Sequence, residues 1–258
     1  MARTDRDRHL LDLLRAESAS LAGIAAAAAG GADGGAGLAA PVASCPGWHV
    51  ADTVGHTGTV HRRVTALLEG TDASSLPDPP GAAALVDWFR AGADALAAAL
   101  DRRDPDDEVW TFSSVGDRTV RWWLRRQALE TALHRVDVAD ATGGAVGPLD
   151  ARLAVEGIRE LLVDFLPRAV AGPDGDGAGP LPGGTLHLHA TDVDDGGEWL
   201  VDLSARPVDV REGHAKADTA VRGPASALLL RLWNRPPGAP LEVFGSPAVL
   251  DGWAAIRF

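Results

Sequence analysis

Hydrophobic residues recur every three or four positions throughout the first half of the chain, which is the spacing that one face of an α-helix produces. We therefore expect four helices here, separated by polar or Gly/Pro-rich connections. Four helices of about 20 residues with such connections are typical of a four-helix bundle. The expected helices span residues 4–29, 49–70, 82–103 and 117–142, with hydrophobic stripes that include Leu10, Leu14, Leu21 and Ala25; Val60, Val64 and Leu67; and Leu85, Phe89 and Leu96.

The second half of the chain has a different pattern. Residues 150–170 show helical spacing, and short alternating runs of hydrophobic and polar residues follow, which predict half-buried strands. The segment DVDDGG between the first two runs is typical of a hairpin turn. We expect strands at 185–191, 198–204, 208–213, 219–223 and 241–245, and further helices at 226–235 and 246–256.

The pattern changes near residues 145–149 and divides the chain there. We expect a helical domain at residues 1–146 and a small α+β domain at residues 147–258, so the predicted fold class is α+β with two domains. A length of 258 residues accommodates two such domains. Two glycine-rich breaks, at residues 30–37 and 172–184, lack the spacing of a phosphate-binding loop.

Charge and composition exclude several classes of protein. Residues 1–145 carry 14 basic and 20 acidic side chains, and the rest of the chain carries 10 and 16, for a net charge of −12. Neither half offers a basic surface for a phosphate backbone, so we do not expect nucleic-acid binding. The basic residues are 23 arginines and a single lysine, Lys216, and this preference for arginine is typical of a GC-rich genome.

The cellular compartment is predicted from what the sequence lacks. A single cysteine, Cys45, excludes a disulfide framework and a cysteine-rich zinc site. The first residues, MARTDRDRHLLDLL, lack the apolar core of a signal peptide, and no apolar stretch is long enough for a membrane span. We expect a cytoplasmic protein, a monomer or a homodimer, without a membrane partner.

Candidate chemistry lies on the second and fourth predicted helices. Glu130 and His134 are four residues apart and share one helix face, on a stripe where a bundle helix usually carries leucine. His56 precedes Val60 by one turn and is expected to face the bundle interior as well. A buried glutamate needs a charge, a donor or a metal as its partner. Two imidazoles and a carboxylate suit zinc or a similar divalent ion, with coordination positions left open.

Simpler interpretations exist for these and the other candidate residues. Glu130 and His134 at this spacing also form ordinary exposed ion pairs. His61 points about 140° away from His56, which favours a structural role or the edge of a pocket. His187 and His189 are either a second metal-binding pair or part of a half-exposed hairpin. Cys45 is either a nucleophile or a small residue before a Pro-Gly turn.

Two segments of the chain resemble a known family. CPGWHVADTVGHTGTVHRRV (45–64) and ETALHRVDVADATG (130–143) are similar to the two signatures of the mycothiol-dependent maleylpyruvate isomerase family. The segments LHLHATDVDDGGEWLVDLS (186–204), TAVRGPASALLLRLWNR (219–235) and LEVFGSPAVLDGW (241–253) look like its C-terminal domain. Val136 departs from the family pattern, which often has tryptophan there, so the local wall of the pocket differs.

The resemblance implies a fold and a cofactor. It implies a DinB-like four-helix bundle followed by a small α+β domain related to sterol-carrier folds. It also implies a divalent metal, usually zinc, bound by His56, Glu130 and His134. Arg135 and Asp137 match the signature positions after the second histidine, and Asp137 would orient a metal ligand through a hydrogen bond.

The resemblance also implies a reaction in which mycothiol, a low-molecular-weight thiol of actinobacteria, is the cosubstrate. A bound metal lowers the pKa of the thiol, and the thiolate adds to an electrophilic substrate. Elimination after bond rotation gives cis–trans isomerisation, and retention of the adduct gives S-transfer. A dicarboxylate substrate would need cations, for which Arg231 and above all Arg235, the candidate catalytic residue, are available. The simpler interpretation, surface solvation or stabilisation of a helix C-terminus, is favoured for both arginines.

Two alternatives to an enzyme remain. The α+β domain would bind a hydrophobic ligand if Trp199, Trp233 and Trp253 lined a cavity, although tryptophans in a small domain usually belong to the core. The bundle would otherwise be a metal-binding regulatory or stress protein without catalysis.

Overall fold

The structure is a computed structural model that describes residues 3–30, 36–171 and 179–258. Parts of the two glycine-rich breaks therefore lie outside the described residues. The chain forms two compact units, residues 1–112 with 116–147, and residues 113–115 with 148–258. The division into independent domains at residue 146 stays a prediction. Within the described residues, no helix combines the length and hydropathy that a membrane span requires.

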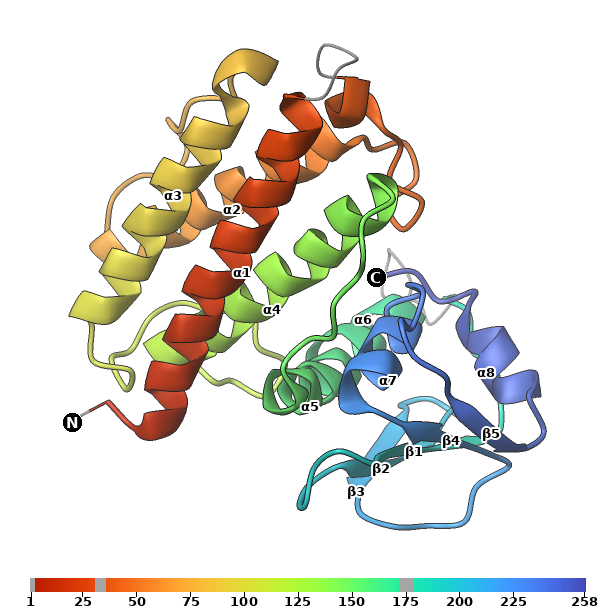
Figure 1. The fold of residues 1–258 in the computed structure, drawn as a ribbon. Coiled ribbons are helices and arrows are strands. Elements are labelled where there is room, and N and C mark those ends of the chain that lie inside the picture. The colour runs from red at the N-terminus through yellow and green to blue at the C-terminus, as the bar shows by residue number, and fades with distance from the viewer. Residues whose placement is uncertain (1–2, 31–35, 172–178) are drawn as a thin grey trace. The chain divides into compact units, whose positions relative to one another are not determined.

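The first unit is the predicted four-helix bundle (Figure 1). Helix α1 packs against α4 and α3, and α2 packs against α3 and α4. A short 3₁₀ turn, Ala36–Ala39, leads towards α2. The helices are α1 (Asp5–Ala29), α2 (Val50–Glu69), α3 (Ala82–Arg102) and α4 (Val120–Ala141), each within three residues of its predicted ends.

Local capping defines where the helices of the bundle begin. Thr4 and Asp7 form a reciprocal capping box at the start of α1, in which the Thr4 side chain accepts from the Asp7 backbone. Thr119 caps α4 by accepting from the backbone of Trp122. Asp7 is fully buried and also accepts a hydrogen bond of 2.8 Å from Nε of Arg121, so the same carboxylate links α1 to α4.

A glycine allows α2 and α3 to approach closely. A Cβ atom at Gly58 would lie 2.3 Å from the Trp88 ring, well inside van der Waals contact. The Arg62 guanidinium lies 3.7 Å from the centroid of the same ring, a cation–π contact. The indole of Trp88 thus fills the space that a larger residue would occupy at position 58.

The interior face of α2 differs in part from the predicted one. The predicted stripe contained His56, Val60, Val64 and Leu67; Val64 is buried, whereas the other three side chains are half-buried. Thr57 and His61 are buried and each has a hydrogen-bond partner, on α2 and on α4 respectively. The buried face thus contains polar and small positions that hydrophobic spacing does not detect. Its members include Val54, Thr57, Gly58, His61, Val64 and Leu68.

Helix α4 is buried on almost every side, from Val120 to Ala139 with few exceptions. Its buried residues include seven with polar or charged side chains, and most of these have partners on other elements or on α4 itself. One such link joins α4 to α1, where Nε of Arg135 donates to a carboxylate oxygen of Glu17 over 2.5 Å. The candidate metal ligands Glu130 and His134 belong to this buried set.

The second unit begins with helices. The predicted helix at 150–170 is present as α5 (Ala151–Glu160), a π-helical turn (Leu161–Phe165) and α6 (Leu166–Ala171). Two short helices follow later in the chain, α7 (Ala225–Leu232) and α8 (Ala248–Trp253). The carboxylate of Asp164, in the π-helical turn, accepts from the backbone N–H of Ser114 over 2.5 Å, which explains why residues 113–115 belong to this unit.

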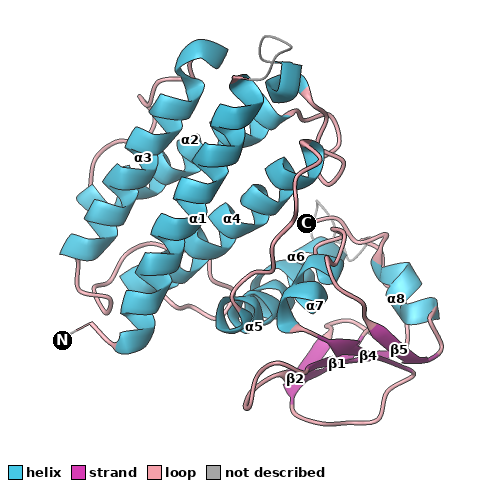
Figure 2. Cartoon of the chain, in the orientation of Figure 1, coloured by secondary structure: helices cyan, strands magenta, loops and turns pink. Residues whose placement is uncertain are grey.

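A five-stranded mixed sheet completes the second unit (Figure 2). The strand order is β3-β2-β1-β4-β5; β1 and β4 are parallel, and the other neighbours are antiparallel. Leu186, Leu188 and Ala190 alternate along β1 and are buried in the core. The strands are β1 (Thr185–Ala190), β2 (Glu198–Asp202), β3 (Asp209–Glu212), β4 (Thr219–Gly223) and β5 (Glu242–Gly245), so the α+β class is confirmed.

Candidate metal centre

Helices α2 and α4 bring the three predicted ligands together. Nε2 of His56 lies 3.1 Å from Oε1 of Glu130, and Nε2 of His134 lies 3.3 Å from the same oxygen. The two imidazole rings meet edge to face, with centroids 5.3 Å apart. One donor atom from each residue therefore points to a common region, which we call the bundle cluster.

Further side chains hold the bundle cluster in place. Arg126, one turn before Glu130, pairs with Oε2 of Glu130 and leaves Oε1 directed at the imidazoles. Asp137 accepts from Nδ1 of His134 over 2.9 Å, and its other oxygen accepts from the Ser44 hydroxyl over 2.5 Å. With Nδ1 of His134 engaged in this way, Nε2 is the nitrogen that faces the cluster.

The loop before α2 covers the two histidines with an indole. Gly47 adopts a positive φ of 86°, which glycine adopts without strain, and the Trp48 amide donates back to Cys45 over 2.9 Å. This turn places the Trp48 ring 4.8 Å from the His56 ring and 6.1 Å from the His134 ring. The Pro-Gly-Trp motif of the sequence therefore forms one wall of the bundle cluster.

The charges of the cluster stabilise one another. Burial alone would raise the pKa of Glu130, but Arg126 and His134 outweigh it and hold that pKa well below its usual value. Burial would likewise lower the pKa of His134, yet Glu130 and Asp137 raise it to about 9. A cation that binds His134 must therefore displace a proton from the ring.

The donor set and its exposure fit a divalent transition metal. Two imidazole nitrogens and one carboxylate oxygen, with ligand atoms all within 4.8 Å of one another, are the donors that zinc and similar ions take in sites with open positions. The His56 side chain is 38% exposed, whereas the side chains of Glu130 and His134 are 10% exposed. The cluster is thus accessible from the side of His56.

Two other sequence candidates near the cluster have different surroundings. Sγ of Cys45 lies 3.9 Å from a carboxylate oxygen of Asp137, and a neighbouring carboxylate does not activate a thiol for nucleophilic attack. Cys45, His134 and Asp137 form a second donor group that shares His134 with the first. His61 is fully buried, with Nε2 2.9 Å from the Thr131 hydroxyl, which favours the structural role.

In the second unit, the candidate arginines contact the backbone. Arg231 donates to the carbonyl of Leu250 over 3.0 Å, and Arg235 donates to the carbonyl of Trp233 over 3.1 Å. Trp199 and Trp253 are buried in the core, and Nε1 of Trp253 donates to a backbone carbonyl over 2.8 Å. Trp233, the third tryptophan of the hydrophobic-ligand hypothesis, is half-buried, and that hypothesis stays a prediction.

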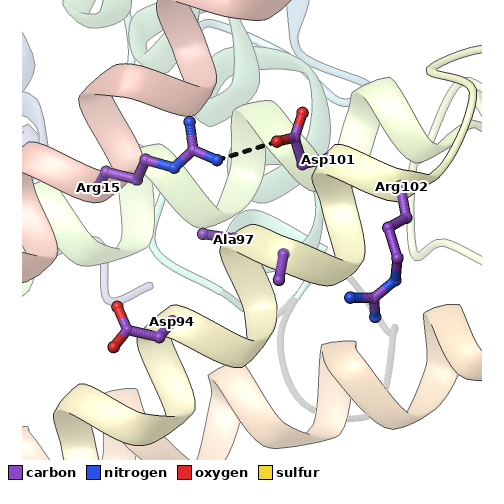
Figure 3. Close-up of a pocket in the computed structure, with 6 residues that line it drawn as sticks. Arg15, Asp94, Ala97, Asp101 and Arg102 are labelled. Atoms are coloured by element: carbon purple, nitrogen blue, oxygen red, sulfur yellow. Dashed lines mark hydrogen bonds and ion pairs between the residues drawn. The ribbon is translucent and has the colours of Figure 1, made fainter.

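A hollow on the bundle surface shares no residue with the cluster (Figure 3). Across it, Arg15 of α1 donates to Asp101 of α3 over 3.1 Å. Its two acidic and two basic side chains balance in charge and are half-buried or exposed, as in an ordinary solvated ion pair between helices. The lining residues are Arg15, Asp94, Ala97, Ala98, Asp101 and Arg102.

Two family models match the chain in the order of its two units. Residues 14–139 match the mycothiol maleylpyruvate isomerase N-terminal domain, and residues 152–252 match the MDMPI C-terminal domain. Together these matches span most of the chain. The chain belongs to the mycothiol maleylpyruvate isomerase family. The first model includes His56, Glu130 and His134, and the second includes Arg231 and Arg235.

Solved structures show the same fold at low sequence identity. A crystal structure of mycothiol-dependent maleylpyruvate isomerase matches with 13% identity and a TM-score of 0.54, covering 92% of each chain. A histidine-to-alanine mutant of mycothiol-dependent maleylpyruvate isomerase matches with 13% identity and a TM-score of 0.51, covering 86% of this chain and 87% of that one. A search of curated protein sequences gives no match. At this identity the matches show that the chain and these structures share a fold, and the chemistry depends on the residues of the bundle cluster.

Sequence reasoning overlooked three residues that support the cluster. Arg126 precedes Glu130 by four residues, a spacing at which an ion pair was recognisable in advance. Trp48 lies in the first signature segment, but the sequence did not indicate its contacts with His56 and His134. Ser44 reaches Asp137 across 93 residues of sequence, and no local pattern predicts such a contact.

Proposed function

We propose that this member of the family is a divalent-metal-dependent enzyme that activates mycothiol for addition to an electrophilic substrate. The observation that carries the proposal is the convergence of the His56 and His134 Nε2 atoms on one oxygen of Glu130. Family membership supports the choice of mycothiol as the thiol. Zinc suits this donor set best among common ions, and other divalent transition metals also fit.

His56, Glu130 and His134 would hold the cation, which would lower the pKa of a bound thiol enough for the thiolate to be present at neutral pH. The protein residues around it have separate tasks. Asp137 fixes the tautomer and orientation of His134. Arg126 neutralises the second oxygen of Glu130 and keeps the carboxylate ionised. The exposed side of His56 admits the thiol.

The reaction needs no redox partner. The thiolate sulfur adds to an electron-poor alkene carbon, a C–S bond forms, and the π electrons move onto the conjugated carbonyl. Rotation about the resulting single bond and loss of the thiolate restore the double bond, so isomerisation regenerates mycothiol. If the carbanion takes up a proton instead, the thioether remains and the thiol is consumed. That Arg235, with Arg231, binds an anionic substrate stays a prediction from the sequence; in the second unit both side chains donate to backbone carbonyls.

One alternative has a specific observation in its favour. Arg126 already supplies a cation to Glu130, and Asp137 supplies an anion to His134, so the four residues also form a balanced ion-pair network. In that case the bundle cluster would stabilise the fold without a metal. The two functions differ in whether the protein retains a metal when the ligands are intact.

Metal analysis of purified, untagged protein tests the proposal directly. We expect about one divalent ion per chain at the bundle cluster and its loss in His56→Ala, which removes the most exposed ligand and disturbs folding least. His9→Ala, a change at an exposed histidine of α1, is the matched control and should retain the ion. Equal metal content in the two variants would reject the metal centre.

A thermal-shift series identifies the thiol. Mycothiol at about 100 times its Kd should stabilise the metal-loaded protein by roughly 2.7 kcal/mol, while glutathione should have little effect. The stabilisation should vanish in His56→Ala and persist in His9→Ala. Counting mycothiol before and after turnover then separates the reactions, because isomerisation leaves its amount unchanged and S-transfer consumes it.

A further inference from the structure

Imidazoles also gather in the second unit, on the face of the sheet that lies opposite its buried leucines. His187 and His189 lie two residues apart on β1 and share the face opposite Leu186 and Leu188. Antiparallel pairing sets Glu198, the first residue of β2, directly across from His189. The register therefore places two histidines and a carboxylate on one patch of that face.

A third histidine reaches this patch from the segment after β3. The amide of Gly213 donates to the carbonyl of Glu198 over 2.9 Å, and Gly213 has a φ of 110°, a conformation that favours glycine. This turn carries His214 back over β2. Three separate stretches of chain thus contribute donors to one place.

The donor atoms converge on a single carboxylate. Nε2 of His187 lies 2.9 Å and Nδ1 of His214 lies 2.7 Å from Oε2 of Glu198. Nε2 of His189 lies 3.9 Å from the other oxygen of the same carboxylate. The His187 and His214 rings meet edge to face, with centroids 5.1 Å apart, much as the histidines of the bundle cluster do.

We propose that His187, Glu198 and His214 form a second binding site for a divalent transition-metal ion, which we call the sheet cluster. Ligand atoms of these three residues lie within 4.8 Å of one another. Imidazole nitrogen favours zinc, copper or nickel over magnesium or calcium, which prefer oxygen ligands. His189 lies beside the site and is the nearest additional imidazole.

Burial defines what kind of site this is. The His187 side chain is 5% exposed and is held by the sheet, whereas the His214 side chain is 79% exposed. An ion bound here joins the segment after β3 to β1 and β2 through one solvent-facing ligand. We therefore expect it to exchange readily and to bind more weakly than an ion at the bundle cluster.

The test compares zinc stoichiometry in the full-length, untagged chain after equilibrium dialysis. Because His214 is exposed, His214→Ala removes a ligand without disturbing the core; His9→Ala is the matched control. The control should bind one zinc more per chain than His214→Ala. If the variant still binds this zinc, its affinity should be at least about tenfold lower, which is the size of effect that even residues outside the ligand set produce at metal sites. Combining His189→Ala with His214→Ala should abolish any remaining binding there.

The outcome does not depend on the proposed function. If the bundle cluster binds no metal, the control should bind one zinc per chain and His214→Ala none. If the bundle cluster does bind metal, the control should bind two zinc ions per chain and His214→Ala one. Equal stoichiometry and affinity in the control and in the double variant would overturn the sheet cluster. Zinc should also raise the melting temperature of His56→Ala, and adding His214→Ala to that variant should remove the increase.

Discussion

The bundle cluster and the sheet cluster each combine two histidines and one glutamate, in different surroundings. In the bundle, Glu130 is 8% exposed and has an arginine partner, and a carboxylate orients one of its histidines. On the sheet, the Glu198 side chain is 28% exposed, and the described residues give it histidine partners only. A buried carboxylate needs its own counter-charges, whereas solvent supplies part of them for a carboxylate that is partly exposed.

The largest expected difference concerns stability without metal. Glu130→Gln removes the carboxylate from a buried arginine and a buried histidine, and breaking such a pair costs about 3–5 kcal/mol. Urea denaturation in the presence of a chelator measures the free energy of unfolding. The control is Asp140→Asn, which removes a carboxylate from an exposed position on the same helix. A loss below about 1 kcal/mol would mean that the bundle network is not buried as described.

The next prediction concerns pH and the buried histidine of the bundle. Burial lowers the pKa of His61 to about 3, so the native state keeps this ring neutral while the unfolded chain takes up a proton below about pH 6.5. Its contribution to stability is therefore complete above that pH and is lost as the pH falls. Between pH 7 and 5 the loss is about 2 kcal/mol.

His61→Leu should remove this dependence. The difference in unfolding free energy between wild type and variant should be constant above about pH 7.5 and shift by about 2 kcal/mol in favour of the variant towards pH 5. Denaturant titrations at a series of pH values give the comparison, with the alkaline points as the internal control. Parallel profiles across the whole range would contradict a neutral, buried His61.

A smaller effect is expected from the residue that orients a ligand. Asp137→Asn should weaken zinc binding at the bundle cluster by about 10–100-fold, because the neutral amide no longer fixes the tautomer of His134. Zinc binding at the sheet cluster should not change. Competition with a colorimetric chelator measures both affinities, and exposed Asp140→Asn is the control one turn further along α4. Equal weakening by both variants would exclude a specific role for Asp137.

The smallest effect is expected at the sheet cluster itself. Glu198→Gln should change the unfolding free energy by less than about 1 kcal/mol in chelator, because the group is partly solvated and its partners are histidines. It should still remove the zinc-dependent rise in melting temperature. Glu212→Gln on β3, whose carboxylate pairs with Arg159 over 2.7 Å, is the control. A loss of several kcal/mol would show that Glu198 is as tightly integrated as Glu130.

Sequence was sufficient for the α+β architecture, and the three residues it singled out as metal ligands lie together, while their role as ligands stays a prediction. Helical spacing and Gly/Pro breaks located the four bundle helices, and the Glu130–His134 spacing gave the face of α4. The interior face of α2 was predicted only in part, because Thr57 and His61 are buried polar residues whose hydrogen-bond partners lie on α2 and α4. Periodicity measures hydrophobicity and does not detect such pairing.

Contacts between distant residues explain most of what the sequence did not reveal. Nothing in the loop after β3 indicated that His214 would return to Glu198, because the return depends on the conformation of Gly213 and on strand register. His187 and His189 were recognised as sharing a strand face, but their third partner was not. The parallel pairing of β1 with β4 also requires knowledge of the whole sheet.

The most direct measurement uses cobalt in place of zinc in His214→Ala, where the bundle cluster is the metal site that our account retains. Adding mycothiol should produce a thiolate-to-cobalt charge-transfer absorption, since a thiol that coordinates a divalent ion is deprotonated. His56→Ala in the same background should abolish the band. A cobalt-loaded protein whose spectrum does not change with saturating mycothiol would contradict the central claim that this cluster activates the thiol.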